Sequence, residues 1–377
     1  MIPFSLTRFR AVVVKEFIQM VRDRLTFAMM VGIPVLQLVM FGYAINSDPR
    51  ALPTAVVVGD NGTFARSIVR ALENTTYFRV VAWPDDADEA DELLARGKVQ
   101  FVVDIPVDFS RRLLRGERPA ILVEADATDP VATGNALAAL SEINRTALAH
   151  DLTGPLSSLQ SRNPAFDIRI QKRYNPEGIT EYNIVPGLMG TILTMTLAMM
   201  TAIAVTREFE RGTMENLLAT PVRPLEVMLG KIVPYVFAGF VQVLVILLAA
   251  AALFQVPLEG SLILLMACVF LFIAANLAMG FTFSTLARSQ LQAMQMSVFF
   301  FLPSMLLSGF MFPFRGMPGW AQTAGELLPL THFLRIVRGI LLKGNGWAEV
   351  WPDTWPILLF LVAVSAVALR RYRKTLD

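Results

Sequence analysis

Long apolar runs without charged side chains constrain this chain more than any other feature. A membrane-spanning helix needs about 20 consecutive, mainly apolar residues. Six runs are long enough, or nearly so: residues 25–46, 183–205, 232–254, 261–286, 290–312 and 354–370. The last is the weakest, because its apolar core begins only at Trp355. Only 17% of the residues are charged, against about 25% in soluble domains. The sequence therefore predicts an α-helical polytopic membrane protein with six transmembrane helices.

The distribution of Lys and Arg predicts the orientation, because basic residues accumulate in cytoplasmic segments. They are concentrated before the first run, in the loop 207–231 and in the C-terminal tail, whereas the loop 255–260 has none. With six spans these basic segments fall on one side. We expect both termini in the cytoplasm and a multi-pass protein of the cell inner (cytoplasmic) membrane. The loop 313–350 argues against this, because it should lie outside and yet contains Arg315, Arg335, Arg338 and Lys343.

The N-terminal segment has features of an uncleaved membrane anchor. Residues 1–24 are basic and amphipathic, which is typical of a helix lying along the inner membrane interface. The run 25–46 is longer than the hydrophobic part of a usual signal peptide and has no clear cleavage site. We interpret residues 1–24 as a cytoplasmic interfacial helix and 25–46 as the first transmembrane helix.

Residues 47–181 form a different region, with 20 acidic and 15 basic residues. Strand-like runs at 54–58, 77–83, 99–105 and 120–126 alternate with helical patterns at 62–74, 85–97, 106–117 and 135–152. This alternation is typical of an α/β domain with a small sheet. A further strand in 166–176 would return the chain to the second span. Given the orientation above, we expect an inserted α/β extracytoplasmic domain.

The sequence contains no recognisable group of catalytic residues and no motif for ATP hydrolysis. It contains one cysteine, two histidines far apart, and no GxxxxGK[ST] phosphate-binding loop. The acids between Asp85 and Glu92 are more typical of a solvated helix start than of a metal site. The spans also lack the ionisable residues that ion-coupled transporters need. We therefore expect no cofactor, no metal and no enzymatic activity on this chain, and a transporter of this kind must be driven by another protein.

The stretch "REFERGTMENLLATPVRP", residues 207–224, lies between two spans. Its mixed charges and apolar residues are compatible with docking into a groove of another protein, or with a solvated loop helix held by weak ion pairs. Pro221 and Pro224 prevent the helix from continuing.

The order of these segments, together with residues 207–231 and "LPSMLLSGFMFPFRGMPGWAQTAGELLPLTHFLRIVRGILLKG" at 302–344, resembles an ABC-2 type transporter permease of the efflux type. The resemblance implies a coupling helix at 207–218 that contacts a cytoplasmic ATP-binding subunit, which binds ATP and Mg. It also implies a dimer of two permease subunits, identical or paralogous, and is compatible with a periplasmic membrane-fusion adaptor; we expect no nucleic acid partner. The implied coupling residues are Arg207, Glu208, Phe209, Glu210, Arg211, Gly212, Thr213, Met214, Glu215, Leu217 and Leu218.

In the resembled family the second and fifth spans face the translocation path. Here they are rich in Thr, Met, Gln and Phe, and Met and aromatic surfaces adapt to varied apolar ligands. The path candidates are Thr191, Thr194, Met195, Met199, Gln292, Gln295, Met296 and Phe299. For each single residue, packing between helices or contact with lipid is the alternative. The cargo would be hydrophobic or amphipathic, such as a drug, a xenobiotic or a lipid-like molecule.

The pattern of residues 313–345, in the outer loop, predicts a turn followed by an amphipathic helix. The apolar residues near one face of this helix are Leu330, Leu334, Val337 and Leu341. It is too short and too charged to be a seventh span, so we expect a re-entrant or interfacial hairpin in which His332 is structural. Two other functions stay open: an ion-coupled secondary exporter, and a non-transporting receptor or scaffold that uses the extracytoplasmic domain.

Overall fold

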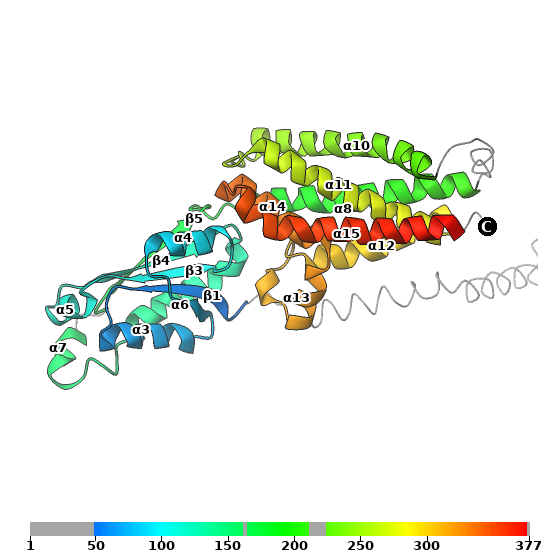
Figure 1. The fold of residues 1–377 in the computed structure, drawn as a ribbon. Helices are drawn as coiled ribbons and strands as arrows, with labels where there is room; N and C mark the ends of the chain where they lie inside the picture. The colour runs from blue at the N-terminus through cyan, green and yellow to red at the C-terminus, as the bar shows by residue number, and fades with distance from the viewer. Residues whose placement is uncertain (1–48, 161–163, 211–223, 375–377) are drawn as a thin grey trace, which may run out of the picture.

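The computed structural model describes residues 49–160, 164–210 and 224–374. An α/β domain lies at one end of the elongated molecule and a helix bundle at the other (Figure 1). The predicted segments 1–24 and 25–46, and residues 211–218 of the predicted coupling helix, lie outside the described residues.

The α/β domain is built on a five-stranded sheet with the order β2-β1-β3-β4-β5. The strands are β1 (Leu52–Val58), β2 (Phe78–Ala82), β3 (Phe101–Ile105), β4 (Ala120–Asp126) and β5 (Asp167–Arg173). The helices are α3 (Thr63–Asn74), α4 (Ala87–Ala95), α5 (Phe109–Leu114), α6 (Pro130–Thr146), the 3-10 turn η2 (Gly154–Leu156) and α7 (Ser157–Gln160). Strand β1 is parallel to β2 and β3, β4 is antiparallel to β3, and β5 is parallel to β4. The predicted α/β fold with a small sheet is therefore confirmed.

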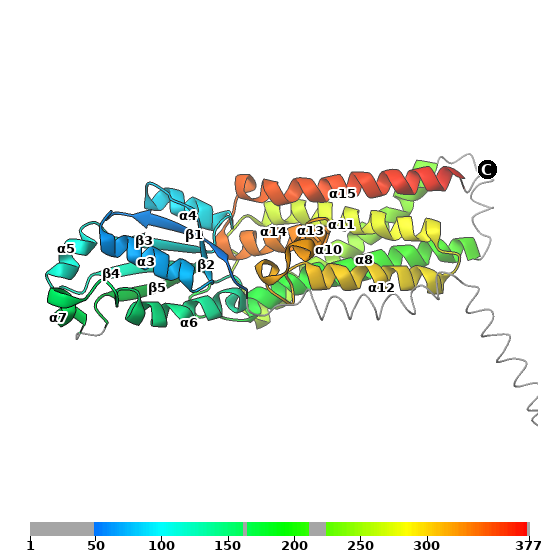
Figure 2. The same cartoon turned by 90° about the horizontal axis from the view of Figure 1, so that it is seen from below.

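The two faces of the sheet are covered by different helices because successive strand residues point to opposite sides. Phe101 and Val103 pack with α3, α5 and α6, whereas Val102 packs with Leu94 of α4. In Figure 1, α4 lies above the strands and α3 lies below them, and Figure 2, seen from below, shows α3 in front of the strands. The acids at the start of α4 cap the helix: Asp86 accepts a hydrogen bond from the Glu89 backbone N–H at 2.8 Å.

Both predicted bounds of one helix in this domain are wrong. The sequence predicts a helix over 135–152, but α6 begins at Pro130 and ends at Thr146. The start is set by Asp129, whose carboxylate accepts hydrogen bonds from the N–H groups of Val131 and Ala132. Proline at the first helical position needs no such partner.

Five helices of the described part are long and apolar enough to cross a membrane. They belong to α8 (Glu181–Glu210), α10 (Pro224–Leu253), α11 (Leu262–Leu286), α12 (Gln290–Leu307) and α15 (Trp347–Lys374). They correspond to the second to sixth predicted spans. Short elements, η3 (Phe314–Gly316), α13 (Gly319–Glu326) and α14 (Pro329–Lys343), lie between α12 and α15.

Two span boundaries differ from the prediction. The helix predicted over 290–312 ends at Leu307, because Gly309 adopts a left-handed conformation with φ +83° that turns the chain. The span predicted to begin at residue 354 belongs to a helix that begins at Trp347. In its first turn, Glu349 accepts a hydrogen bond from the Gly346 N–H at 2.9 Å. An acidic residue at this place stabilises the start of the helix.

Helices α8 and α11 form the centre of the bundle, and α10, α12 and α15 surround them. At Gly280 of α11, an added Cβ would lie 2.4 Å from the Ala198 carbonyl oxygen of α8, so the two backbones are in close contact. The outer helices expose large apolar side chains, including Phe237 at 72% and Leu359 at 58%. A surface of this kind fits contact with lipid.

The segment 313–345 contains two helices, α13 and α14, where the sequence predicts a turn and one helix. The predicted apolar face of α14 is buried, but Phe333, Ile336 and Ile340 are buried as well. The Phe333 ring stacks on Phe272 of α11 at a centroid distance of 3.9 Å. Helix α14 is therefore enclosed by the bundle on more than one side.

Candidate translocation unit and its junction with the α/β domain

Helix α8 joins the α/β domain to the far end of the bundle. Its 30 residues give a length of about 45 Å at about 1.5 Å per residue. Near its start, the Asn183 amide donates to the Asp129 carboxylate at 3.3 Å. At its end, Glu210 accepts hydrogen bonds from the backbone and side-chain N–H groups of Gln290, which begins α12. One continuous helix thus runs from the junction with the α/β domain to the far end of the bundle (Figure 1).

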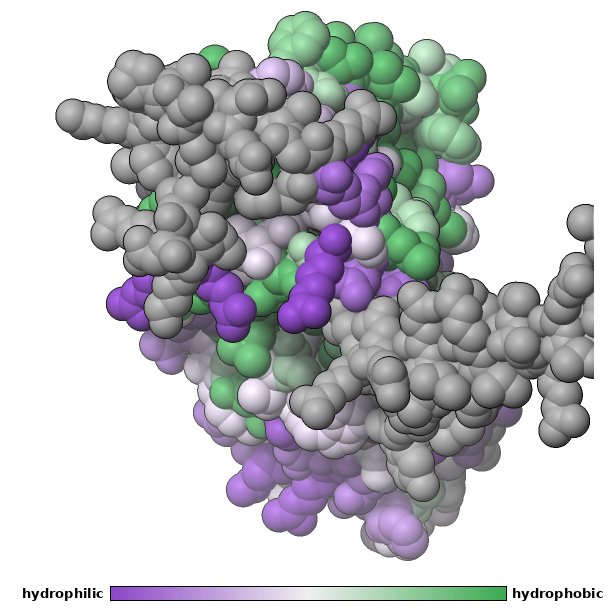
Figure 3. All heavy atoms as spheres, turned by 90° about the vertical axis from the view of Figure 1, so that its right-hand side faces the viewer, coloured by the Kyte–Doolittle hydropathy of each residue, from purple (hydrophilic) through white to green (hydrophobic). Residues whose placement is uncertain are grey.

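The predicted coupling helix does not begin as a separate element. Residues 207–210 are the last turn of α8, so the second span and the first part of the predicted helix form one helix. Arg207 and Glu210 are exposed, while nothing is described of the Glu208 and Phe209 side chains. Arg211, Gly212, Thr213, Met214, Glu215, Leu217 and Leu218 lie outside the described residues. Figure 3 views this end of the bundle and shows hydrophilic side chains at the end and apolar ones along the flank.

The path candidates on α8 separate into two groups. Thr191 and Thr194 are buried, and their hydroxyls donate to the carbonyls of Gly187 and Gly190 on their own helix, at 3.2 and 2.8 Å. The structure therefore places these threonines in helix packing. Met195 is 41% exposed and Met199 is half-buried. The exposed apolar face of α8 also includes Ile184, Leu188 and Ile192.

Helix α12 packs against α8 and carries the other candidates. Phe299 is 41% exposed, and Gln292, Gln295 and Met296 are half-buried. The Gln292 side chain accepts from the Arg288 N–H at 2.9 Å and so helps to cap the helix. The side-chain amide oxygen of Gln295, Oε1, is buried and has no hydrogen-bond partner in the described part of the chain. Both helices thus expose apolar surface, with Met195, Met199 and Phe299 contributing to it.

The α/β domain is attached to α14 by a buried ion pair. The Lys343 ammonium contacts the Asp126 carboxylate, and the two side chains are only 8% and 9% exposed. Lys343 also donates to the Leu94 carbonyl at 3.3 Å and lies 5.0 Å from the centre of the Tyr174 ring. Next to it, Asn345 donates to the Ala95 carbonyl at 3.2 Å. These contacts hold the C-terminal end of α14 against α4 and β4.

A second polar cluster joins α13, α14 and α15. The His332 ring bonds through Nδ1 to the Asp353 carboxylate at 2.8 Å and through Nε2 to the Glu326 carbonyl at 2.9 Å. Arg335 forms ion pairs with both Glu326 and Asp353. His332 is 5% exposed, and these bonds agree with the structural role predicted for it. Asp353 and Glu326 were not predicted as members of this cluster, because the only local signal is that each is a charged residue beside an apolar run.

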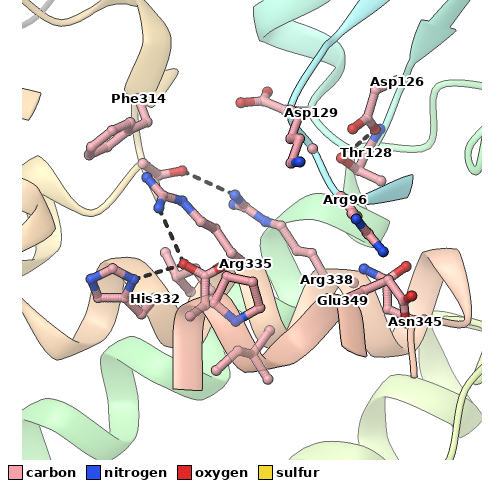
Figure 4. Close-up of a pocket in the computed structure, with 18 of the residues that line it drawn as sticks. Arg96, Asp126, Thr128, Asp129, Phe314, His332, Arg335, Arg338, Asn345 and Glu349 are labelled. Atoms are coloured by element: carbon pink, nitrogen blue, oxygen red, sulfur yellow. Dashed lines mark hydrogen bonds and ion pairs between the residues drawn. The ribbon is translucent and has the colours of Figure 1, made fainter. Parts of the chain in front are cut away.

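A cavity of about 510 Å³ lies between the two clusters, where the α/β domain meets the bundle. One wall comes from the end of α4 and from the loop 126–129, the other from α14 and the start of α15. Figure 4 shows Arg338 rising from α14 into this space, with Asp129 on the opposite wall. Among the described residues, no group of three His, Cys, Asp or Glu side chains is arranged to hold a metal ion.

Comparisons with known proteins agree over nearly the whole chain. Residues 24–370 match the model of a family described as "ABC-2 family transporter protein". The chain is 33% identical to "Probable multidrug ABC transporter permease YbhS" of Escherichia coli (strain K12), and the match covers 90% of each chain. It is 31% identical to "Inner membrane transport permease YhhJ" of the same organism, over 91% of this chain and 93% of the relative. "Probable multidrug ABC transporter permease YbhR" is 25% identical over 96% of each chain.

Proposed function

This chain belongs to the ABC-2 family of transporter proteins and is a membrane permease subunit of an ABC transporter, and we propose that a separate cytoplasmic ATP-binding subunit drives export through it. ATP and Mg bind to that partner, because the sequence contains no GxxxxGK[ST] loop. The relatives are transport permeases, not enzymes.

The observation that carries the energy-transfer part of this proposal is the continuity of α8. A push on residues 207–218 acts directly on the last turn of a helix whose other end is bonded to the α/β domain through Asn183. A rigid helix transmits such a displacement along its length, whereas a flexible loop absorbs it. Arg207 and Glu210 are exposed at the point where the partner would make contact.

The translocation path is formed by two permease subunits, either two copies of this chain or this chain and a paralogue. Their α8 and α12 helices face each other, which covers the apolar surface of Met195, Met199 and Phe299 when the path is closed. Flexible Met and flat Phe side chains accommodate apolar molecules of different shapes. The cargo is therefore a hydrophobic or amphipathic molecule.

The proposed orientation follows the basic residues. Both termini and residues 207–218 lie in the cytoplasm, and the α/β domain lies outside, where a periplasmic adaptor would reach it. The hydrophilic bundle end carries four exposed arginines, Arg207, Arg288, Arg370 and Arg371, which fits a cytoplasmic face.

Cysteine labelling tests the orientation. The single cysteine, Cys268, is 2% exposed, so C268A provides a background for R371C at the bundle end and R111C in the α/β domain. A membrane-impermeant maleimide should label R111C in intact spheroplasts and R371C only in inverted vesicles. The reverse pattern would refute the orientation and, with it, the cytoplasmic contact.

Transport by inverted vesicles tests the coupling. We expect ATP-dependent uptake of a lipophilic fluorescent dye when the chain is co-expressed with the ATP-binding subunit that co-purifies with it. The double variant E208A/R211A should insert normally but lose most of this uptake, while R111A, a charge change in the α/β domain, should not. Equal uptake by E208A/R211A would remove the coupling role of 207–218. Uptake driven by an ion gradient without ATP would instead support a secondary exporter.

A further inference from the structure

The cavity between the α/β domain and the bundle, called the junction cavity below, is lined by positive charges that have no role in the transport proposal. Its volume of about 510 Å³ falls within the range of about 300–1,000 Å³ that is typical of small-molecule sites. It is lined by Arg and Lys residues from both walls, including Arg96, Lys98, Arg315 and Arg338. Apolar side chains, among them Trp355, complete the lining.

The carboxylates around this cavity already have partners. Asp126 contacts Lys343 and accepts two hydrogen bonds from Thr128. Glu326 and Asp353 are paired with Arg335. The remaining carboxylate on the α/β wall, Asp129, accepts hydrogen bonds from the first turn of α6 and from Asn183 of α8.

Arg338 is a cation of the lining whose hydrogen bonds are only partly satisfied among the described residues. It donates one hydrogen bond, from Nη1 to the Gly309 carbonyl at 3.2 Å. Its Nε and Nη2 atoms are enclosed and have no acceptor within the described residues. Burial lowers the pKa of Arg338, and the negative charges of Asp129 and Asp126 only oppose this effect. Buried guanidinium N–H groups without an acceptor are costly, so an acceptor at this place would stabilise the junction.

We propose that the junction cavity binds the anionic headgroup of an amphiphile, with a phosphate held by the guanidinium of Arg338. Arginine donates in a planar fork that matches two oxygens of one phosphate group. Lys98, which lines the same cavity, adds positive charge near the ligand. The phosphate contact does not depend on the coupling proposal, because it concerns residues at the opposite end of α8 from the ATPase contact; the assignment to the outer leaflet rests on the proposed orientation.

The size and place of the cavity indicate an amphiphile. A single free phosphate would fill only a small part of about 510 Å³. Trp347, Trp351 and Trp355, at the start of α15, are 54%, 46% and 49% exposed, and exposed Trp residues mark the level of lipid headgroups. A headgroup can therefore reach Arg338 while its acyl chains stay beside the apolar bundle. A phospholipid of the outer leaflet is the simplest source, and a soluble organic phosphate would have the same anionic group.

Photocrosslinking tests this site in the full chain. The protein is reconstituted in phosphatidylcholine nanodiscs that contain a trace of photoactivatable phosphatidylglycerol, and labelled peptides are mapped. We expect adducts in the segments that line the cavity, 95–100, 308–315 and 332–356. Unlabelled phosphatidylglycerol should compete, whereas added phosphatidylcholine should not. Adducts spread evenly over the lipid-facing helices would overturn the proposal.

Variants connect the labelling to Arg338. A hydrogen bond to a charged group contributes about 1.5–3 kcal/mol, so R338Q should weaken competition by phosphatidylglycerol about tenfold to hundredfold. R111Q removes an arginine of the domain surface that is 60% exposed and should change nothing. If R338Q does not fold, R338K serves instead, because it keeps the charge but loses the fork; it should bind measurably more weakly than the wild type.

Two results decide the remaining alternatives. Equal competition in the wild type and in the Arg338 variant would refute the site. If glycerol phosphate competes as well as phosphatidylglycerol in the wild type and loses its effect in R338Q, the phosphate site stands and its ligand is a soluble organic phosphate.

Discussion

Replacing Lys343 with Met removes the charge that pairs with Asp126 but keeps a side chain of similar length. Removing one partner of a buried ion pair costs about 3–5 kcal/mol, because the other charge stays buried. Both groups here are less than 10% exposed, and K343M also loses the bond to the Leu94 carbonyl and the contact with Tyr174. Asp126 keeps its two bonds from Thr128, so we expect the lower end, about 3 kcal/mol.

This loss should appear as opening of the junction. A change of about 3 kcal/mol corresponds to roughly a hundredfold increase in the open population. Hydrogen exchange of peptides covering 93–98 and 341–346 should accelerate by about that factor, while the strand β3 should not change. The double variant K343M/D126N removes the unpaired charge and should recover most of the protection. Exchange within threefold of the wild type in K343M, or no recovery in the double variant, would refute the reasoning.

Two further predictions concern packing and pH. G280A places a Cβ 2.4 Å from the Ala198 carbonyl oxygen and should lower the thermal unfolding temperature. The control variant G134A adds a Cβ with nothing within 4 Å and should leave the unfolding temperature equal or higher. Similar unfolding temperatures of the two variants would refute the close α8–α11 contact. Burial acts to raise the pKa of Asp60, but hydrogen bonds from backbone N–H groups outweigh it and lower that pKa. The stability from Asp60 should therefore be present above the normal pKa of about 3.9 and be lost below it. Burial raises the pKa of Asp104, so its ionisation costs stability as the pH rises through its normal pKa. At pH 7, D60N should destabilise and D104N stabilise the α/β domain in chemical denaturation; shifts of the opposite sign would refute these assignments.

The strands and most helices were predictable because their signals are local. β4 coincides with the predicted run 120–126, and α3 begins one residue after the predicted start. The sheet order was not predictable, because pairing of β4 with β3 in antiparallel orientation and with β5 in parallel orientation joins segments far apart in the sequence.

The surroundings of α14 show why the functional region was harder to predict. The Arg and Lys residues of α14 indicate a helix with one solvent-exposed face, yet α14 is enclosed by the bundle and the α/β domain. Lys343 and Arg335 are satisfied by Asp126 and Asp353, which come from other elements. Hydropathy along the helix contains no information about such partners. Similarly, α8 is apolar around much of its circumference, so the sequence could not separate the buried Thr194 from the exposed Met195.

One loop of the α/β domain connects these observations. The loop 126–129 binds α14 through Asp126 and Lys343, and it binds α8 through Asp129 and Asn183. The two helices also touch each other directly, since an added Cβ at Gly190 of α8 would lie 2.7 Å from Leu330 of α14. In the proposed mechanism, a displacement of α8 therefore moves the loop and α14 with it, unless the Asn183–Asp129 hydrogen bond or the buried Lys343–Asp126 ion pair breaks. We infer that the α/β domain moves with α8 during transport. K343M should then reduce ATP-dependent transport although Lys343 lies at the opposite end from 207–218, and unchanged transport in K343M would show that the domain is not coupled to the helix.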